Sequence, residues 1–172
     1  MDETSLSPDC ARCAALCCVS LAFDRSASFA IDKPNGVVCP NLADDNLCRI
    51  HADRERLGFS GCISFDCLGA GQRVIQEVFG GRSWRDDPAL LPDITRAFTI
   101  MRQVHEALLL LREAAKLALP EAERGALERL LTDLAPSGGW TLEALAAVEQ
   151  DQTPKRVRAF LASLKTYVAA QR

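Results

Sequence analysis

The sequence predicts a mainly α-helical protein, with a cysteine-rich, loop-rich metal-binding module followed by a carboxy-terminal helical bundle or hairpin set. Two observations carry this prediction. All eight cysteines lie within residues 10–67 of the 172-residue chain, and apolar residues recur at helical spacing through much of 93–168. With 48% hydrophobic and 25% charged residues, the composition is that of a globular protein. We expect a cysteine-rich module over 1–84 and a helical region over 85–172 packed on it, with one compact domain as the alternative.

A first helix is predicted to begin at residues 7–9. Their sequence, Ser-Pro-Asp, is typical of a helix start, with a capping serine, a proline in the first position and an acid in the first turn. A continuous helix would place Cys10, Cys13 and Cys17 on one face. Cys18 would lie about 100° further round. The helix dipole would favour a thiolate at Cys10 in the first turn.

The segment 24–61 is predicted to be irregular. Residues 32–36 and 39–42 have turn composition, and only 29–31 and 37–38 indicate short strands. So long a stretch without periodicity needs something that holds it in place. The cysteines within it and just after it are the obvious anchors.

The rest of the chain is predicted to be helical. Two glycines at 80–81 end the first of these helices, Asp93 and Thr141 are predicted caps, and Pro120 ends the longest helix. In chain order, the predicted helices span 72–79, 93–119, 121–134, 141–149 and 153–168.

Composition also limits the cellular localisation and the classes of partner that the protein can have. The net charge of −3 provides no basic footprint for nucleic acid. The acidic start at 1–3 does not resemble a signal peptide, and no apolar run approaches the roughly 20 residues of a membrane span. We therefore expect a cytoplasmic protein with neither nucleic acid nor membrane as a partner, while a protein partner stays open. In a reducing cytosol, clustered cysteines are more often metal ligands or catalytic thiols than disulfides.

Metal ligation is the chemistry that the cysteines favour, because thiolates are soft ligands for zinc and iron–sulfur clusters. Cys10 and Cys13 form a Cys-x-x-Cys pair. The neighbours Cys17 and Cys18 suit one mononuclear tetrahedral site poorly. This favours an iron–sulfur cluster slightly over zinc, and the alternative is that the eight thiols divide into two sites. Burial as a small hydrophobic residue is the alternative for one or two of the eight cysteines, with Cys18 and Cys62 as the candidates. The candidate ligands are Cys10, Cys13, Cys17, Cys18, Cys39, Cys48, Cys62 and Cys67.

Several of these residues form an ordered set. It comprises Cys10-x2-Cys13-x3-Cys17-Cys18, Cys39-Pro40-Asn41-Leu42, Cys48-Arg49-Ile50-His51, Arg54, Arg56 and Cys62. This set resembles the cysteine-rich zinc- or iron-chelating family named for its CxxCxxCC motif. The chain departs from the motif by one extra residue in the first cluster and by His51 where an aromatic residue is usual. The resemblance covers residues 10–67 and implies metal chelation without indicating a substrate.

Residues 29–34, 58–62 and 66–72 are also similar to the cysteine-rich amino-terminal segment of some bacterial pentapeptide-repeat proteins. This likeness extends to about Trp84, and the pentapeptide repeats themselves are absent from the sequence. The resemblance again implies metal chelation, and it carries over nothing that a repeat array does.

We therefore expect a metal-binding protein whose iron–sulfur cluster or zinc has a structural or redox-sensing role. The alternative is a redox or electron-transfer enzyme that uses an open cluster site or a reactive cysteine, so whether the chain is an enzyme stays open, and no catalytic residue is assigned. A third hypothesis is a disulfide-stapled protein without metal. We expect His51 to act as a structural or supporting residue and His105 to lie in the core of the long helix.

Overall fold

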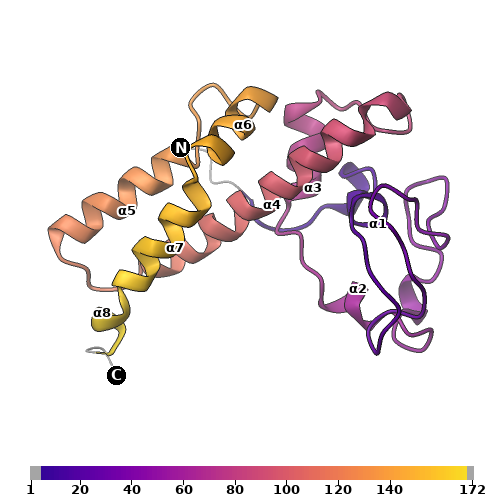
Figure 1. Cartoon of the computed structure of the whole chain (residues 1–172), viewed down its shortest axis with the longest axis horizontal. Coiled ribbons are helices and arrows are strands. Elements are labelled where there is room, and N and C mark those ends of the chain that lie inside the picture. Colours follow the sequence, from indigo (N-terminus) through magenta and orange to yellow (C-terminus); the bar gives the residue numbers. More distant parts are fainter. Residues whose placement is uncertain (1–4, 170–172) are drawn as a thin grey trace. The chain divides into compact units, whose positions relative to one another are not determined.

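The structure, a computed structural model, describes residues 5–169 (Figure 1). This part of the chain is mainly helical, with isolated β-bridges in place of strands, which confirms the predicted fold class. The chain divides into two compact units, 1–99 and 100–172. The division falls inside the long helix α4 (Leu91–Ala114). The predicted modules, 1–84 and 85–172, stay a prediction.

The first unit begins with two short helices instead of one continuous helix. The 3-10 turn η1 (Cys10–Arg12) is followed by α1 (Leu16–Ser20). Between them, Ala14 and Ala15 have φ angles of 48° and 56°, in the left-handed region that a right-handed helix excludes. The prediction of one helix that carries the first three cysteines on one face is therefore wrong.

The start of the chain is held by other contacts than those predicted. The side chain of Asp9, not that of Ser7, caps the first turn by accepting a hydrogen bond from the Ala11 amide at 3.2 Å. The indole N–H of Trp84 donates to the carbonyl of Ala14 at 2.8 Å. This buried contact joins residues 70 positions apart, and it stabilises a turn that local propensity disfavours.

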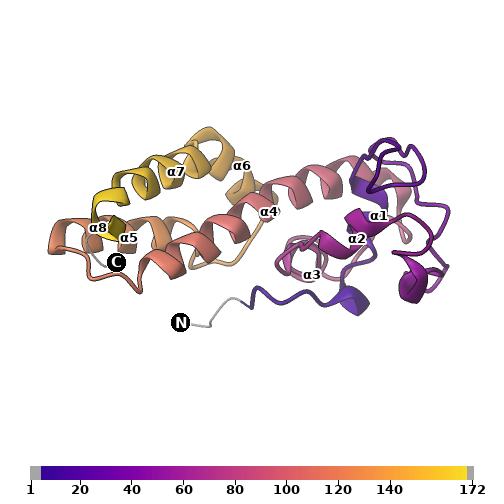
Figure 2. The same cartoon turned by 90° about the horizontal axis from the view of Figure 1, so that it is seen from below.

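The segment after α1 is irregular, as predicted, and appears in Figure 2 as an indigo and purple trace with little helix. The predicted strands at 29–31 and 37–38 are wrong, because the described residues pair only in isolated bridges. These bridges are Phe23↔Lys33, Ser26↔Phe29 and Leu42↔Cys48. The rings of Phe23 and Phe29 stack with their centres 4.3 Å apart. Two short helices close the segment, η2 (His51–Asp53) and α2 (Ser60–Ser64).

The predicted helix at 72–79 is present as α3 (Ala70–Arg73) and the π-helical η3 (Val74–Val78). Gly80 and Gly81 follow with φ angles of 60° and 86°, which confirms the predicted glycine ending. The long helix begins earlier than predicted.

Before α4, the side chain of Asp87 accepts a hydrogen bond from the Ala89 amide at 3.0 Å and caps η4 (Pro88–Leu90). Asp93 consequently lies in the first turn of α4 and is not its cap.

The second unit is helical, and up to residue 169, where the description ends, four further helices follow the end of α4. Thr141 caps one of them as predicted, because its side chain accepts a hydrogen bond from the Ala144 amide at 3.1 Å. Figures 1 and 2 show two of them, α5 and α7, side by side. The four helices are α5 (Glu121–Asp133), α6 (Leu142–Gln150), α7 (Thr153–Ser163) and α8 (Lys165–Ala169).

The core of the second unit forms where the helices present apolar faces to one another. Ala114, Leu127 and Leu164 are buried there, and Phe160 and Tyr167 are among the partly buried residues packed against them. Amphipathic helices bury such faces because removal of apolar surface from water is the main favourable term in folding.

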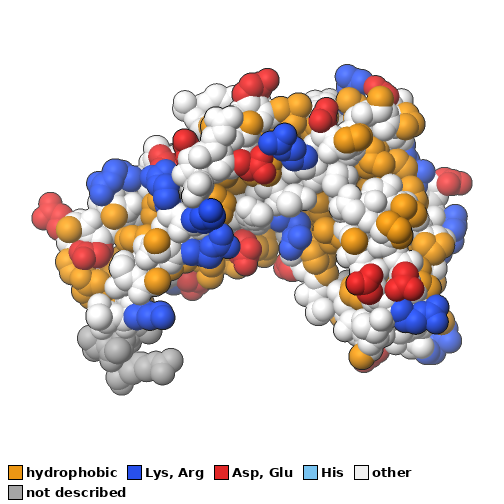
Figure 3. Space-filling model, viewed as in Figure 1, with side chains coloured by type: hydrophobic (Ala, Val, Ile, Leu, Met, Phe, Trp, Pro, Cys, Tyr) orange, Lys and Arg blue, Asp and Glu red, His pale blue; other side chains and the backbone are white. Residues whose placement is uncertain are grey.

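Acidic and basic side chains are mixed on the face of the molecule that Figure 3 shows. Apolar side chains lie between them. Within residues 5–169, no helix combines the length and the apolar character needed to cross a bilayer.

Replacing Leu127 with alanine should destabilise the second unit. Leu127 is 4% exposed and Leu142 is 41% exposed, so Leu142→Ala is a matched control. We expect Leu127→Ala to lower the free energy of unfolding by about 2 to 5 kcal/mol and the control to change it by less than about 1 kcal/mol. Urea unfolding followed by circular dichroism measures both. Equal losses would contradict the assignment of this core.

Candidate metal centre

All eight cysteines are free thiols in the first unit. Their exposure differs, which affects how each thiol ionises. Cys13 and Cys39 are buried, with exposed fractions of 7% and 8%, whereas Cys10 is exposed. The half-buried members are Cys17, Cys18, Cys48, Cys62 and Cys67. The structure thus gathers all of the predicted ligands into one compact unit.

Cys13 lies at the left-handed turn. Burial raises the pKa of its thiol to about 11, although the backbone amides of Leu16 and Ala15 lower this pKa by hydrogen bonding to the sulfur. Amides that donate to a sulfur atom favour its thiolate form, which is the form that binds metal. Gly71 of α3 packs against the same side chain, since a Cβ atom there would come within 2.9 Å of the Cys13 Cβ.

Four thiols form a first electrostatically linked set. Although Cys10 is exposed, partial desolvation of its thiol raises its pKa, and negative charge at Cys17 and Cys67 raises it further. Negative charge at Cys17 and Cys10 likewise raises the pKa of Cys13. Cys10, Cys13, Cys17 and Cys67 are therefore near enough to influence one another, although Cys67 is distant in sequence.

A second set lies around Cys62. Burial raises the pKa of Cys62, and charge at Cys17, Cys39 and Cys48 adds to the effect. The amide of Cys39 donates to the carbonyl of Cys18 at 2.9 Å. The interaction with the Cys18 thiol is the largest cause that raises the pKa of Cys17, ahead of burial. Cys17 thus links the two sets.

Arg54 joins two segments of the second set and acts through its charge on one thiol of each set. Its guanidinium donates to the carbonyl of His51 at 2.9 Å and to the carbonyl of Cys62 at 3.1 Å. Its positive charge lowers the pKa of both Cys10 and Cys62, against the effect of burial. Arg56, the other basic residue of the motif, instead pairs with Asp53 at 3.1 Å on the exposed surface.

Lys33 is a charged residue that the sequence analysis missed. Its side chain is buried, with 3% of the residue exposed. Burial lowers the pKa of Lys33, whereas negative charge at Cys39, Cys18 and Cys17 raises it. The sequence offers no signal of this burial, because Lys33 lies between Asp32 and Pro34 in the turn 32–36, and a turn lysine is normally solvated.

Trp84 and Arg85 hold the loop between Cys39 and Cys48 in place. The Arg85 guanidinium lies 4.5 Å from the centre of the Trp84 ring and donates to the side-chain oxygen of Asn46 at 2.6 Å and to the carbonyl of Ala43 at 2.9 Å. Because Trp84 also binds the carbonyl of Ala14, one pair of residues fixes two cysteine-bearing segments.

The donor chemistry of this region fits a soft metal ion or an iron–sulfur cluster, because thiols gathered in one unit supply the ligands that these groups prefer. Within residues 5–169, no three side chains of Cys, His, Asp or Glu are already arranged around a common metal position. The thiol side chains would have to turn toward one to ligate it.

The predicted activation of Cys10 by a helix dipole is wrong. The helix there is a single 3-10 turn of three residues. Burial and the neighbouring thiols, followed by Asp9, raise the pKa of Cys10 and so oppose a reactive thiolate. His51 is exposed and His105 is fully buried in α4, which confirms the core position expected for His105.

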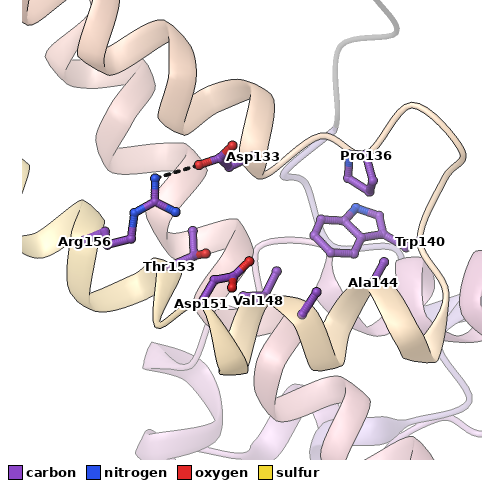
Figure 4. A pocket seen from close by; sticks show the side chains of 9 residues that line it. Asp133, Pro136, Trp140, Ala144, Val148, Asp151, Thr153 and Arg156 are labelled. Atoms are coloured by element: carbon purple, nitrogen blue, oxygen red, sulfur yellow. Dashed lines mark hydrogen bonds and ion pairs between the residues drawn. The ribbon is translucent and has the colours of Figure 1, made fainter.

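The second unit contains an open pocket of about 210 Å³, shown in Figure 4. Pro136, Trp140 and Ala144 line its apolar side. On the other side, Asp133 pairs with Arg156 at 2.9 Å. These two opposite charges already neutralise each other, so the cysteine region is the stronger candidate for a functional site.

Comparison with known proteins gives one informative relative. The chain is 35% identical over 166 residues to a protein of Bacillus subtilis (strain 168) named "Uncharacterized protein YybG". The match covers 96% of this chain and 60% of that protein, so the chain spans less than two thirds of its relative's length. No protein-family profile and no solved structure matches the chain. The relative is bacterial, and its name assigns no activity.

The raised pKa of Cys13 predicts a pH dependence of stability in the metal-free protein. Between pH 9.0 and about 11, the thiol ionises in the unfolded chain and keeps its proton in the folded one. The stabilisation is complete below pH 9.0 and is lost as pH rises through about 11, so the free energy of unfolding should fall by about 2 to 3 kcal/mol.

Urea unfolding of the reduced, chelator-treated protein at about pH 8 and about pH 10 captures about the first half of this loss, roughly 1 kcal/mol. Cys13→Ser, which cannot ionise in this range, serves as the control that subtracts the titration of other groups. An identical pH dependence in both proteins would contradict the environment assigned to Cys13.

Proposed function

We propose that the chain is a metal-binding protein whose cysteine thiolates hold an iron–sulfur cluster or zinc, with a structural or redox-sensing role. The observation that carries this proposal is the electrostatic linkage of all eight thiols within one unit. Cysteines kept only as small hydrophobic residues need not approach one another in this way.

The architecture of the first unit supports the same proposal. Between α1 and α2, the described chain has only the three-residue helix η2 and isolated bridges. A segment with so little regular hydrogen bonding gains stability from cross-links. Metal–thiolate bonds would supply them, and metal binding would then be coupled to folding.

The grouping of the thiols favours two sets of four. One set is Cys10, Cys13, Cys17 and Cys67. We assign Cys18 to the other set, with Cys39, Cys48 and Cys62, because its carbonyl accepts a hydrogen bond from the Cys39 amide. Four thiolates are the usual complement for a structural zinc ion and for an iron–sulfur cluster. Cys17 and Cys18 would serve different sets, which removes the difficulty of placing two adjacent residues on one metal.

A structural or sensing role is better supported than catalysis by a free thiol. Reactive cysteines have lowered pKa values, whereas burial or neighbouring thiols raise the pKa of Cys10, Cys13, Cys17 and Cys62. When bound, the metal would supply Lewis acidity or, as a cluster, electron transfer. The cysteine thiolates of this chain would hold it.

Anaerobic purification followed by metal analysis and absorption spectroscopy tests the proposal. We expect either iron with sulfide and broad visible absorption, or stoichiometric zinc in a colourless sample. Cys13→Ser should lower the metal content by about half or more, because it removes one ligand of a four-thiolate set. Ser60→Ala, an exposed replacement in α2, is the control. A folded protein without metal whose stability does not change in Cys13→Ser would refute the proposal.

A further inference from the structure

The ammonium group of Lys33 is held in a fixed position inside the first unit. It donates hydrogen bonds to three carbonyl oxygens, those of Val37 at 2.9 Å, Pro34 at 3.2 Å and Val19 at 3.3 Å. It also lies 5.5 Å from the centre of the Phe23 ring. Among the residues that the structure describes, no carboxylate pairs with it.

A buried ammonium without a carboxylate is costly, because carbonyl dipoles replace only part of its hydration. Buried charges are normally paired with an opposite charge. The groups near Lys33 that can become negative are the thiols of Cys39, Cys18 and Cys17. They carry negative charge when they bind metal, since thiolates are the ligating form.

The backbone keeps the ammonium beside these cysteines. Val19 directly follows Cys18, and Val37 is two residues before Cys39. The same two segments are joined by the hydrogen bond from the Cys39 amide to the Cys18 carbonyl, at 2.9 Å. Lys33 thus contacts the backbone close to Cys18 and close to Cys39, and it cannot move away without breaking these hydrogen bonds.

We propose that Lys33 is the internal counter-cation of the metal–thiolate centre, a positioning residue that raises its affinity for metal. This inference rests on the metal binding proposed above. A divalent ion held by four thiolates has a net charge of −2, and a buried unit charge of opposite sign stabilises it. Arg54 acts in the same sense on Cys10 and Cys62, so Lys33 serves the thiols on the side of Cys18 and Cys39.

The experiment compares four full-length proteins, with zinc affinity measured anaerobically by competition with a chelator. Lys33→Met removes the charge and keeps the apolar stem, Lys33→Gln keeps hydrogen-bond donors without charge, and Lys116→Met removes an exposed lysine that pairs with Glu113 at 2.6 Å. We expect both Lys33 variants to bind zinc about 10- to 100-fold more weakly than the wild type. Lys116→Met should match the wild type.

Cobalt substitution adds a readout that a purely structural role would not change. Loss of a nearby cation makes the thiolates more electron-rich, so the sulfur-to-cobalt charge-transfer band should move to longer wavelength in both Lys33 variants. The d–d bands should stay in place, because the ligands and geometry are the same.

The outcomes separate this inference from the proposed function. If the wild type binds zinc and Lys33→Gln retains wild-type affinity, hydrogen bonding suffices and the counter-cation role is overturned. The same holds if either variant loses affinity without a shift of the charge-transfer band. If the wild type binds neither zinc nor iron, metal binding itself fails and Lys33 has no such role. Should Lys33→Met fail to fold, Lys33→Gln decides alone.

Discussion

The turn that follows Cys13 is the constraint on which the first unit depends. Ala14 and Ala15 both adopt positive φ angles there, a conformation that costs a residue with a Cβ atom of order 1 kcal/mol or more. The hydrogen bond from Trp84 to Ala14 offsets this cost. The turn directs two amides at the sulfur of Cys13 and ends η1 before α1 begins.

Electrostatics in this unit follows from placing thiols and cations together away from water. Burial raises the pKa of Cys10, Cys13 and Cys62, and thus favours neutral thiols while no metal is bound. Arg54 and Lys33 act in the opposite direction, since each stabilises negative charge on nearby sulfur. In the metal-free protein this balance keeps Cys10, Cys13 and Cys62 protonated. In the proposed metal-bound form, the metal would displace their protons.

The sequence predicted the regular parts of this fold well and the irregular parts poorly, for a physical reason. The helices of the second unit and the cap at Thr141 depend on local spacing, which periodicity reveals. The left-handed alanines depend on Trp84, and the burial of Lys33 depends on carbonyls that only the folded loop assembles. The eight cysteines were visible as candidates, but their grouping depends on contacts between distant segments.

The central claim is that sulfur atoms of this chain hold the metal. X-ray absorption at the metal edge of anaerobically loaded protein tests it most directly, because it reports the atoms bound to the metal whichever metal is present. The account predicts a shell of sulfur, at about 2.3 Å if the metal is zinc. A shell dominated by nitrogen or oxygen would contradict it.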